Sequence, residues 1–412
     1  MLNRLRALRT NENVLLAIDT LLHSKSIFLS TFLMTFMMRM SIDNSPIEFI
    51  AYRLLSIVGV AILTIVLLRF VKKHILLSWR LGMLFSIIRI LVIIFLHTET
   101  VIFPYVLALV TAAESTLFWR PGMFFLISEV RNDRRLRFQS IRQIFSDIAK
   151  IIMPFVLGLT ITEAGYITAA FIILAISAAQ FLLSILFRPS HDIDYPTHSS
   201  DVTFRKITGS PPLRRILYLQ FFRGLVVSGS AFLIVPPLLV YTHTGSNFDL
   251  GLYASIGAII SIITVLAFRS ISRRHNRFSH LFLWIITSFA VVFSAAQVFF
   301  PSNITSIILY VYVVAIIESF FEMFVMGKVQ RSLKKQLAGN SFTLEIESIS
   351  EIFLCVGRTI SLAILLFLIT NSNLEYLPIF ALINAIFVIP VLIFSQSKKS
   401  SSPPLPVEDH LP

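Results

Sequence analysis

Long runs of apolar residues, separated by short clusters of charged residues, recur along the whole chain. A helix needs about 20 mostly apolar residues to cross the ~30 Å hydrocarbon core of a bilayer. The apolarity is continuous, which excludes a membrane β-barrel, whose strands alternate over about 10 residues. The sequence therefore predicts an all-α polytopic membrane protein. We expect twelve transmembrane helices, at approximately residues 24–42, 47–70, 80–97, 101–127, 141–162, 166–187, 214–240, 250–270, 279–299, 304–327, 344–370 and 375–396.

The composition agrees with this fold class. Of the 412 residues, 56% are hydrophobic and 14% are charged, whereas a soluble domain has about 45–50% apolar and ~25% charged residues. The formal net charge of +13 would suit a nucleic-acid-binding protein, but such a protein needs an exposed basic face. We therefore expect the lipid bilayer as a partner and no nucleic acid. The single cysteine, Cys355, excludes an internal disulfide and a cysteine-based metal site.

The positive charges indicate the orientation of the chain. Most lysines and arginines lie in the N-terminal segment and in every second connection, whereas the other connections carry acids such as Asp43, Glu99 and Asp249. Cytoplasmic connections of membrane proteins are enriched in lysine and arginine. The sequence predicts cytoplasmic N and C termini and a multi-pass protein of the cell (plasma) membrane.

The most polar connection, from Arg188 to Pro212, divides the predicted helices into two groups of six. A weak internal repeat accompanies this division, because Glu114-Ser115 recurs 204 positions later as Glu318-Ser319. We expect two pseudo-symmetric six-helix bundles. The predicted division is a cytoplasmic N-terminal segment at 1–23, bundles at 24–187 and 214–396, a cytoplasmic linker at 188–213 and a cytoplasmic tail at 397–412.

This arrangement, with basic connections after the second and eighth helices, resembles the major facilitator superfamily over residues 24–396. The signature of that family after the second helix is reduced here to the cations of residues 68–74, without its aspartate. Residues 152–158 resemble the Gly-Pro stretch of antiporters, with Met153 where a glycine is usual. The stretch favours export. Its Pro154 is also compatible with a simple helix kink.

Twelve charged residues fall inside the predicted helices. Charged side chains are costly in lipid, so these should face the bundle interior, a water-filled cavity or one another. Mutual pairing with a purely structural role is the alternative to a functional one. The cations are Arg39, Arg53, Arg89, Arg120, Lys150, Arg223 and Arg358, and the acids are Glu114, Asp147, Glu318, Glu322 and Glu351.

The resemblance implies that the first, fourth, seventh and tenth helices line a central cavity. On that basis the candidate substrate-binding residues are Arg39, Glu114, Arg120, Arg223, Glu318 and Glu322. Glu318 and Glu322 are four residues apart on one helix face, at about 6 Å, and two carboxylates so placed in a low dielectric favour sharing a proton. We predict proton coupling at Glu318 and Glu322, with Glu114 as the counterpart in the first half.

A second set of charged residues lies near the predicted cytoplasmic ends of the helices. Asp147 and Lys150, three residues apart, can pair locally, and Arg358 needs a partner at its depth. In the resembled family the basic connections lock the cytoplasmic gate. The predicted gating residues are Arg69, Lys72, Lys73, Asp147, Lys150, Glu351 and Arg358.

The sequence predicts a transporter and not an enzyme. It contains neither a G-x-x-x-x-G-K-[ST] phosphate loop nor an H-E-x-x-H zinc motif, and we expect no cofactor and no resident metal. We predict a monomeric secondary active transporter that moves a small organic solute by alternating access, with proton-coupled efflux. The cavity arginines favour an anionic or zwitterionic solute. Proton-coupled uptake is the alternative, followed by a non-transporting sensor or a lipid-handling protein.

Overall fold

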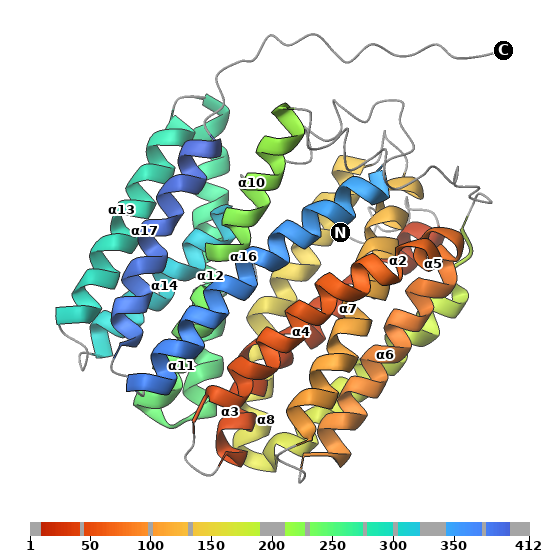
Figure 1. The fold of residues 1–412 in the computed structure, drawn as a ribbon, viewed down its shortest axis with the longest axis horizontal. Helices are drawn as coiled ribbons and strands as arrows, with labels where there is room; N and C mark the ends of the chain where they lie inside the picture. Colours follow the sequence, from red (N-terminus) through yellow and green to blue (C-terminus); the bar gives the residue numbers. More distant parts are fainter. Residues whose placement is uncertain are drawn as a thin grey trace.

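The computed structural model describes residues 10–41, 45–97, 102–130, 135–189, 211–226, 231–274, 278–299, 304–321, 343–372 and 376–395. These residues form helices and short connections, with no strand among them. The helices lie side by side in one inclined bundle, with the first half of the chain on the right of the view and the second half on the left (Figure 1). The all-helical prediction is confirmed for this part of the chain.

The first helix begins earlier than the sequence suggests. It comprises α2 (Thr10–Ile27), a π-helical turn η1 (Phe28–Phe32) and α3 (Leu33–Met40) in direct succession. Residues before 24 are polar enough to resemble a cytoplasmic segment, yet Leu15, Ile18 and Leu22 are buried on one face of α2. The apolar face packs against the first half of the chain, so residues 10–23 continue the helix of the first predicted span.

The remaining helices of the first half are α4 (Ile47–Val66), α5 (Leu68–Lys73), α6 (Ile75–Phe95), α7 (Phe103–Ser128) and α8 (Arg135–Leu186). Within α8, Gly165 leaves the helical conformation at φ 83° and ψ 168°, a region that glycine adopts readily. The chain turns back at this glycine, because Arg142 and Gln180 both contact α2, at Asp19 and Ile18. Two predicted spans therefore meet at Gly165 without an intervening loop.

The second half contains α10 (Pro211–Val226), α11 (Ala231–Thr244), α12 (Asn247–Arg274), α13 (Phe278–Phe299), α14 (Ile304–Phe321), α16 (Thr343–Ser372) and α17 (Leu377–Ser395). Each of the twelve predicted runs overlaps at least one described helix, and the run at 214–240 overlaps both α10 and α11. Six helices among the described residues are long and apolar enough to cross a membrane. Twelve crossings and cytoplasmic termini stay predictions.

The outer surface of the bundle is apolar, as lipid contact requires. Large hydrophobic side chains point outward on both halves, among them Ile65, Leu109 and Phe299 with exposed fractions of 64%, 65% and 76%. A soluble monomer rarely exposes extended apolar surface. The apolar exterior therefore supports a membrane protein with several apolar helices.

The most extensive packing between the two halves is between α4 and α16 and between α8 and α12. At the second crossing Gly158 of α8 and Gly251 of α12 bring the backbones together. A Cβ atom at Gly158 would lie 2.8 Å from the Asn247 carbonyl oxygen, and one at Gly251 would overlap the Pro154 carbonyl oxygen. The Pro154–Gly158 stretch that resembles an antiporter motif thus also has a packing role between the halves.

Candidate functional site

A buried ion cluster occupies the first half of the bundle. It consists of Lys25 of α2, Arg89 of α6 and Glu114 of α7, which are only 1%, 6% and 5% exposed. Arg89 contacts both carboxylate oxygens of Glu114, at 2.9 Å and 3.2 Å. The Lys25 ammonium lies 3.3 Å from the same carboxylate and donates to Ser86 Oγ at 2.5 Å. One buried acid is therefore shared by two buried cations.

This cluster carries an excess of one positive charge. Taking an ion out of water costs several kcal/mol even when the ion is paired, and an uncompensated buried charge costs more. Lys25 also lies 5.7 Å from the centre of the Phe118 ring, where the ring face attracts a cation. The aromatic contact compensates part of the excess, and the cluster remains suited to receive an anion.

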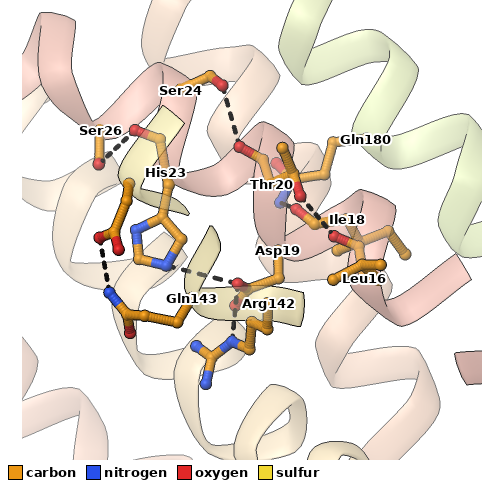
Figure 2. A network of polar contacts seen from close by, with 11 residues as sticks. Leu16, Ile18, Asp19, Thr20, His23, Ser24, Ser26, Arg142, Gln143 and Gln180 are labelled. Atoms are coloured by element: carbon orange, nitrogen blue, oxygen red, sulfur yellow. Dashed lines mark hydrogen bonds and ion pairs between the residues drawn. The ribbon is translucent and has the colours of Figure 1, made fainter. Parts of the chain in front are cut away.

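A second ion cluster joins α2 to α8 (Figure 2). Arg142 donates through Nε to Asp19 Oδ2 at 2.7 Å, and His23 Nε2 lies 3.4 Å from the same oxygen. The sequence suggests that Arg142 is one of the cations of the basic connection after the fourth predicted helix. The structure places it within the helical bundle instead. Its partner Asp19 is almost fully buried, with an exposed fraction of 7%.

A pocket adjoins both clusters, between α2, α6, α7 and α8. Most of its walls are apolar or aromatic, and Asp19 and Arg142 form its polar part. Its lining residues are Leu15, Ile18, Asp19, Leu22, Trp79, Phe118, Trp119, Gly122, Met123, Leu126 and Arg142.

A clasp of five residues joins the two halves where α3 ends, low in Figure 1. The hydroxyl of Tyr166 lies 2.8 Å from Asn247 Oδ1 and 2.9 Å from Thr35 Oγ1. Arg39 donates through Nε to the Tyr241 hydroxyl at 2.9 Å and lies over the Tyr166 ring. Thr35, Arg39 and Tyr166 belong to the first half, whereas Tyr241 and Asn247 belong to the second. In the predicted orientation this is the non-cytoplasmic end, where the clasp ties the two halves together.

We expect Tyr166→Phe to loosen the clasp, because it removes the hydroxyl that bridges the two halves. The loss of one buried hydrogen bond costs about 0.5–1.5 kcal/mol, which favours conformations open at this end. A cysteine introduced at Met38, a buried residue of α3, should then react faster with a membrane-impermeant maleimide. Tyr105→Phe is the matched control, since Tyr105 is 64% exposed. Equal labelling rates in all three proteins would contradict a gating role for the clasp.

The comparison with known proteins agrees with this two-half arrangement. The family model described as Major Facilitator Superfamily matches residues 55–344, which is more than half of the chain. The chain belongs to the Major Facilitator Superfamily. As a member of this superfamily it is a membrane transporter rather than an enzyme. No curated protein matches the chain in sequence.

Solved structures with the same fold support the superfamily assignment. A bacterial homologue of the iron transporter ferroportin in an inward-facing state has 14% identity and a TM-score of 0.66, over 94% of this chain and 98% of that one. The outward-facing state of such a homologue, with soaked iron, has 16% identity and a TM-score of 0.62, over 95% and 100%. A bacterial metal transporter has 16% identity and a TM-score of 0.63, with the same coverage. At these identities the likeness concerns the fold.

The predicted cavity residues lie in different parts of this superfamily member. Glu114 belongs to the buried ion cluster. Arg120 is also buried in α7 and donates to Thr64 Oγ1 of α4 at 2.5 Å, and Arg223 is buried in α10 and donates to Gln220 Oε1 at 3.1 Å. Arg39 belongs to the clasp. Glu318 is half-buried in α14, and Glu322 lies outside the described residues.

The predicted gating residues are mostly accessible. Arg69, Lys73 and Lys150 are exposed and Lys72 is half-buried. Asp147 accepts a hydrogen bond from Gln143 Nε2 at 2.7 Å, so its local partner is Gln143. Arg358 pairs with Glu351 on α16, seven residues away, at 3.2 Å. These contacts supply the partner that Arg358 was expected to need.

Sequence reasoning missed Lys25, Asp19, Arg142 and Trp79 as site residues. Lys25 and Arg142 stand next to other cations or polar residues, so they resemble members of the basic connections. The signal that could have identified Asp19 is its spacing of four residues from His23 within a run of periodic leucines and isoleucines. No comparable signal exists for Trp79, which is one aromatic residue among many in this chain.

Proposed function

We propose that the protein is a secondary active transporter that carries a small anionic or zwitterionic solute by alternating access, coupled to protons. The observation that carries this proposal is the buried cluster in which Lys25 and Arg89 share Glu114. A bound carboxylate would balance the excess charge of the cluster. Arginine suits such a ligand because its planar fork can donate two parallel hydrogen bonds to a carboxylate.

The charge balance of the cluster also indicates how protons would be coupled. Protonation of Glu114 would free Lys25 and Arg89 to bind an anion, so a proton and an anionic solute would bind together. Joint binding favours uptake with protons. Proton-coupled efflux, which the sequence predicts from residues 152–158, requires the opposite relation, and those residues have a packing explanation at the α8–α12 crossing. Glu318 and Glu322 remain the proposed coupling residues of the second half.

Proteoliposomes that contain a pH-sensitive dye can test the coupling. We expect organic carboxylates added outside to bring protons into vesicles that hold the wild-type protein. Glu114→Gln should abolish this proton flux, whereas Glu163→Gln, a change at an exposed residue of α8, should leave it intact. The double variant Glu318→Gln with Glu322→Gln tests in the same assay whether the proposed coupling residues of the second half contribute to the proton flux. Proton exit during solute entry would contradict uptake with protons and support exchange.

A divalent metal ion is the second candidate substrate. Two of the similar structures are homologues of an iron transporter and a third is a metal transporter, and Asp19 and His23 offer an oxygen and a nitrogen that suit such ions. However, Arg142 already contacts the Asp19 carboxylate at 2.7 Å. The described residues also contain no group of three possible metal ligands.

The two substrates can be distinguished by a transport assay with Mn²⁺, Fe²⁺ and Co²⁺ in the same proteoliposomes. Under the main proposal the protein transports none of these ions. The Asp19→Asn variant should likewise respond more strongly to organic carboxylates than to any of the metal ions. Transport of a metal ion that Asp19→Asn and His23→Ala each abolish would favour the second candidate and contradict the first.

A further inference from the structure

We propose that Arg53 of α4 is a third cationic residue of the solute site, beside Lys25 and Arg89, and that the transported solute is a small anion with two negative charges. This inference rests on the proposed function, because it narrows the anionic or zwitterionic solutes to dianions such as dicarboxylates. It follows from the position of Arg53 at the edge of the buried ion cluster and from its lack of an acidic partner among the described residues.

Arg53 lies next to the contact that ties α4 to α7. The hydroxyl groups of Tyr52 and Thr111 are 3.2 Å apart, and both residues are buried. Thr111 precedes Glu114 by three residues on α7, so this contact lies about one helical turn from the carboxylate of the cluster. Adjacent residues of an α-helix point about 100° apart, and α4 packs on α16 as well as on α7. Arg53 is therefore placed where the cluster borders the second half.

The charge of Arg53 is not compensated within the part of the chain that the structure describes. The positive charges of Arg89 and Arg358 both act on Arg53, and no described acid does. Its Nε is buried without a hydrogen-bond partner. A guanidinium cannot be deprotonated in a protein, so Arg53 cannot avoid the cost of an unpaired charge by becoming neutral. Charged residues inside a membrane protein usually pair or serve a function. A bound anion would supply the missing partner.

Arg53 changes the charge balance of the cluster, and with it the solute that fits. Lys25, Arg89 and Arg53 carry one positive charge each, and Glu114 carries the one negative charge that acts among them. The excess is therefore two positive charges. A zwitterion would leave this excess unchanged, and a monocarboxylate would remove half of it. A dianion balances both charges, and arginine is well suited to bind carboxylate or phosphate oxygens.

Arg53 is also the most accessible of the three cations. It is half-buried, whereas Lys25 and Arg89 are enclosed. On the side of the second half, the side chains of Arg358 and Glu351 are 19% and 35% exposed. Charged side chains rarely face lipid, so this exposed surface indicates a hydrated region on the α16 side of Arg53. Arg358 has Glu351 as a counter-charge at 3.2 Å, and a solute that enters from this side meets Arg53 before the enclosed cluster.

Calorimetric titration of the purified full-length protein with succinate and butyrate tests this role. The two anions have the same number of carbon atoms and differ in the second carboxylate, and inorganic phosphate is the dianion of the other chemical type. We expect the wild type to prefer a dianion over butyrate by about tenfold, the equivalent of one charge-assisted hydrogen bond. Arg53→Met should abolish this preference and leave butyrate binding unchanged, whereas Arg53→Lys keeps the charge and should retain most of it. Arg188→Met, at an exposed arginine, is the control.

The melting temperature of the unliganded protein separates a binding role from a structural one. Removal of an uncompensated charge should leave the melting temperature of Arg53→Met equal to that of the wild type or raise it. A lower melting temperature with an unchanged preference for dianions would overturn the inference, as would equal binding of succinate, phosphate and butyrate by the wild type. Arg53→Gln gives the same comparison should Arg53→Met fail to fold.

The outcomes also distinguish this inference from the proposed function. Proton-coupled uptake of butyrate into proteoliposomes, with no preference for a dianion, would support the transport proposal and overturn the role of Arg53. Arg53-dependent binding of a dianion without any uptake would support the site and contradict the transport proposal.

Discussion

Replacing Glu114 by glutamine is expected to lower the stability of the protein by about 3–5 kcal/mol, because it leaves Lys25 and Arg89 buried without a counter-charge. Both cations lie within 3.3 Å of this carboxylate, and both are almost completely buried. The same change should abolish proton-coupled transport, since glutamine keeps residue 114 neutral and cannot take up or release the coupled proton. Thermal unfolding in detergent and uptake into proteoliposomes measure the two effects.

Two further substitutions make this prediction specific, because the cluster predicts how their effects on stability rank against that of Glu114→Gln. Lys25→Met leaves the Arg89–Glu114 pair balanced at one charge each, so it should destabilise much less than Glu114→Gln. Glu163→Gln removes an exposed acid, and surface changes are usually within about 0.5 kcal/mol. If Lys25→Met proved the more damaging of the two cluster variants, the shared carboxylate would not be the element that holds the cluster together.

Gly251→Ala is expected to have the second large effect, by forcing apart α8 and α12 where the two halves cross. The added Cβ would overlap the Pro154 carbonyl oxygen and lie 3.2 Å from the Gly158 Cα atom. Extra volume at a close-packed contact costs about 1–3 kcal/mol. The overlap involves backbone atoms, so no side-chain rotation can relieve it. We expect a lower melting temperature together with faster maleimide labelling at the end closed by the clasp.

Gly257→Ala on the same helix is the matched control. A Cβ there would lie 3.6 Å from the Ala315 Cβ atom, an ordinary contact distance. This variant should be neutral or slightly stabilising, because alanine is more favourable than glycine in a helix interior by about 1 kcal/mol. Equal behaviour of the two variants would show that the α8–α12 crossing tolerates separation and does not limit the closed state.

The helices could be predicted from the sequence because lipid imposes a length and an apolarity on each of them. The eleventh predicted run, 344–370, differs from α16 (Thr343–Ser372) by only a few residues. The start of the first helix could not be predicted, because Asp19 and Lys25 look like residues of an aqueous segment. Their polar groups are satisfied by Arg142 and Glu114, which stand more than eighty positions away.

The site was only partly predictable, for the same reason. Glu114 was identified because a lone acid in a long apolar run demands a partner. Which partners it takes depends on how α2, α6 and α7 pack, and no spacing within the chain encodes this. The assignment of Arg39 to a central cavity followed from its place in the first span, whereas its contacts with Tyr241 and Tyr166 belong to the clasp. The sequence thus predicts which helix carries a residue such as Arg39 better than it predicts where along the bundle the side chain makes its contacts.

The early start of α2 has a practical consequence for engineering this transporter. Leu15, Ile18 and Asp19 stand ahead of the first long apolar run, yet they form one wall of the pocket. A shortened version cut back to that run would retain every hydrophobic stretch and lose this wall together with the partner of Arg142. Affinity tags and fluorescent fusions are therefore better attached ahead of residue 10 than inserted within the polar residues that precede the run.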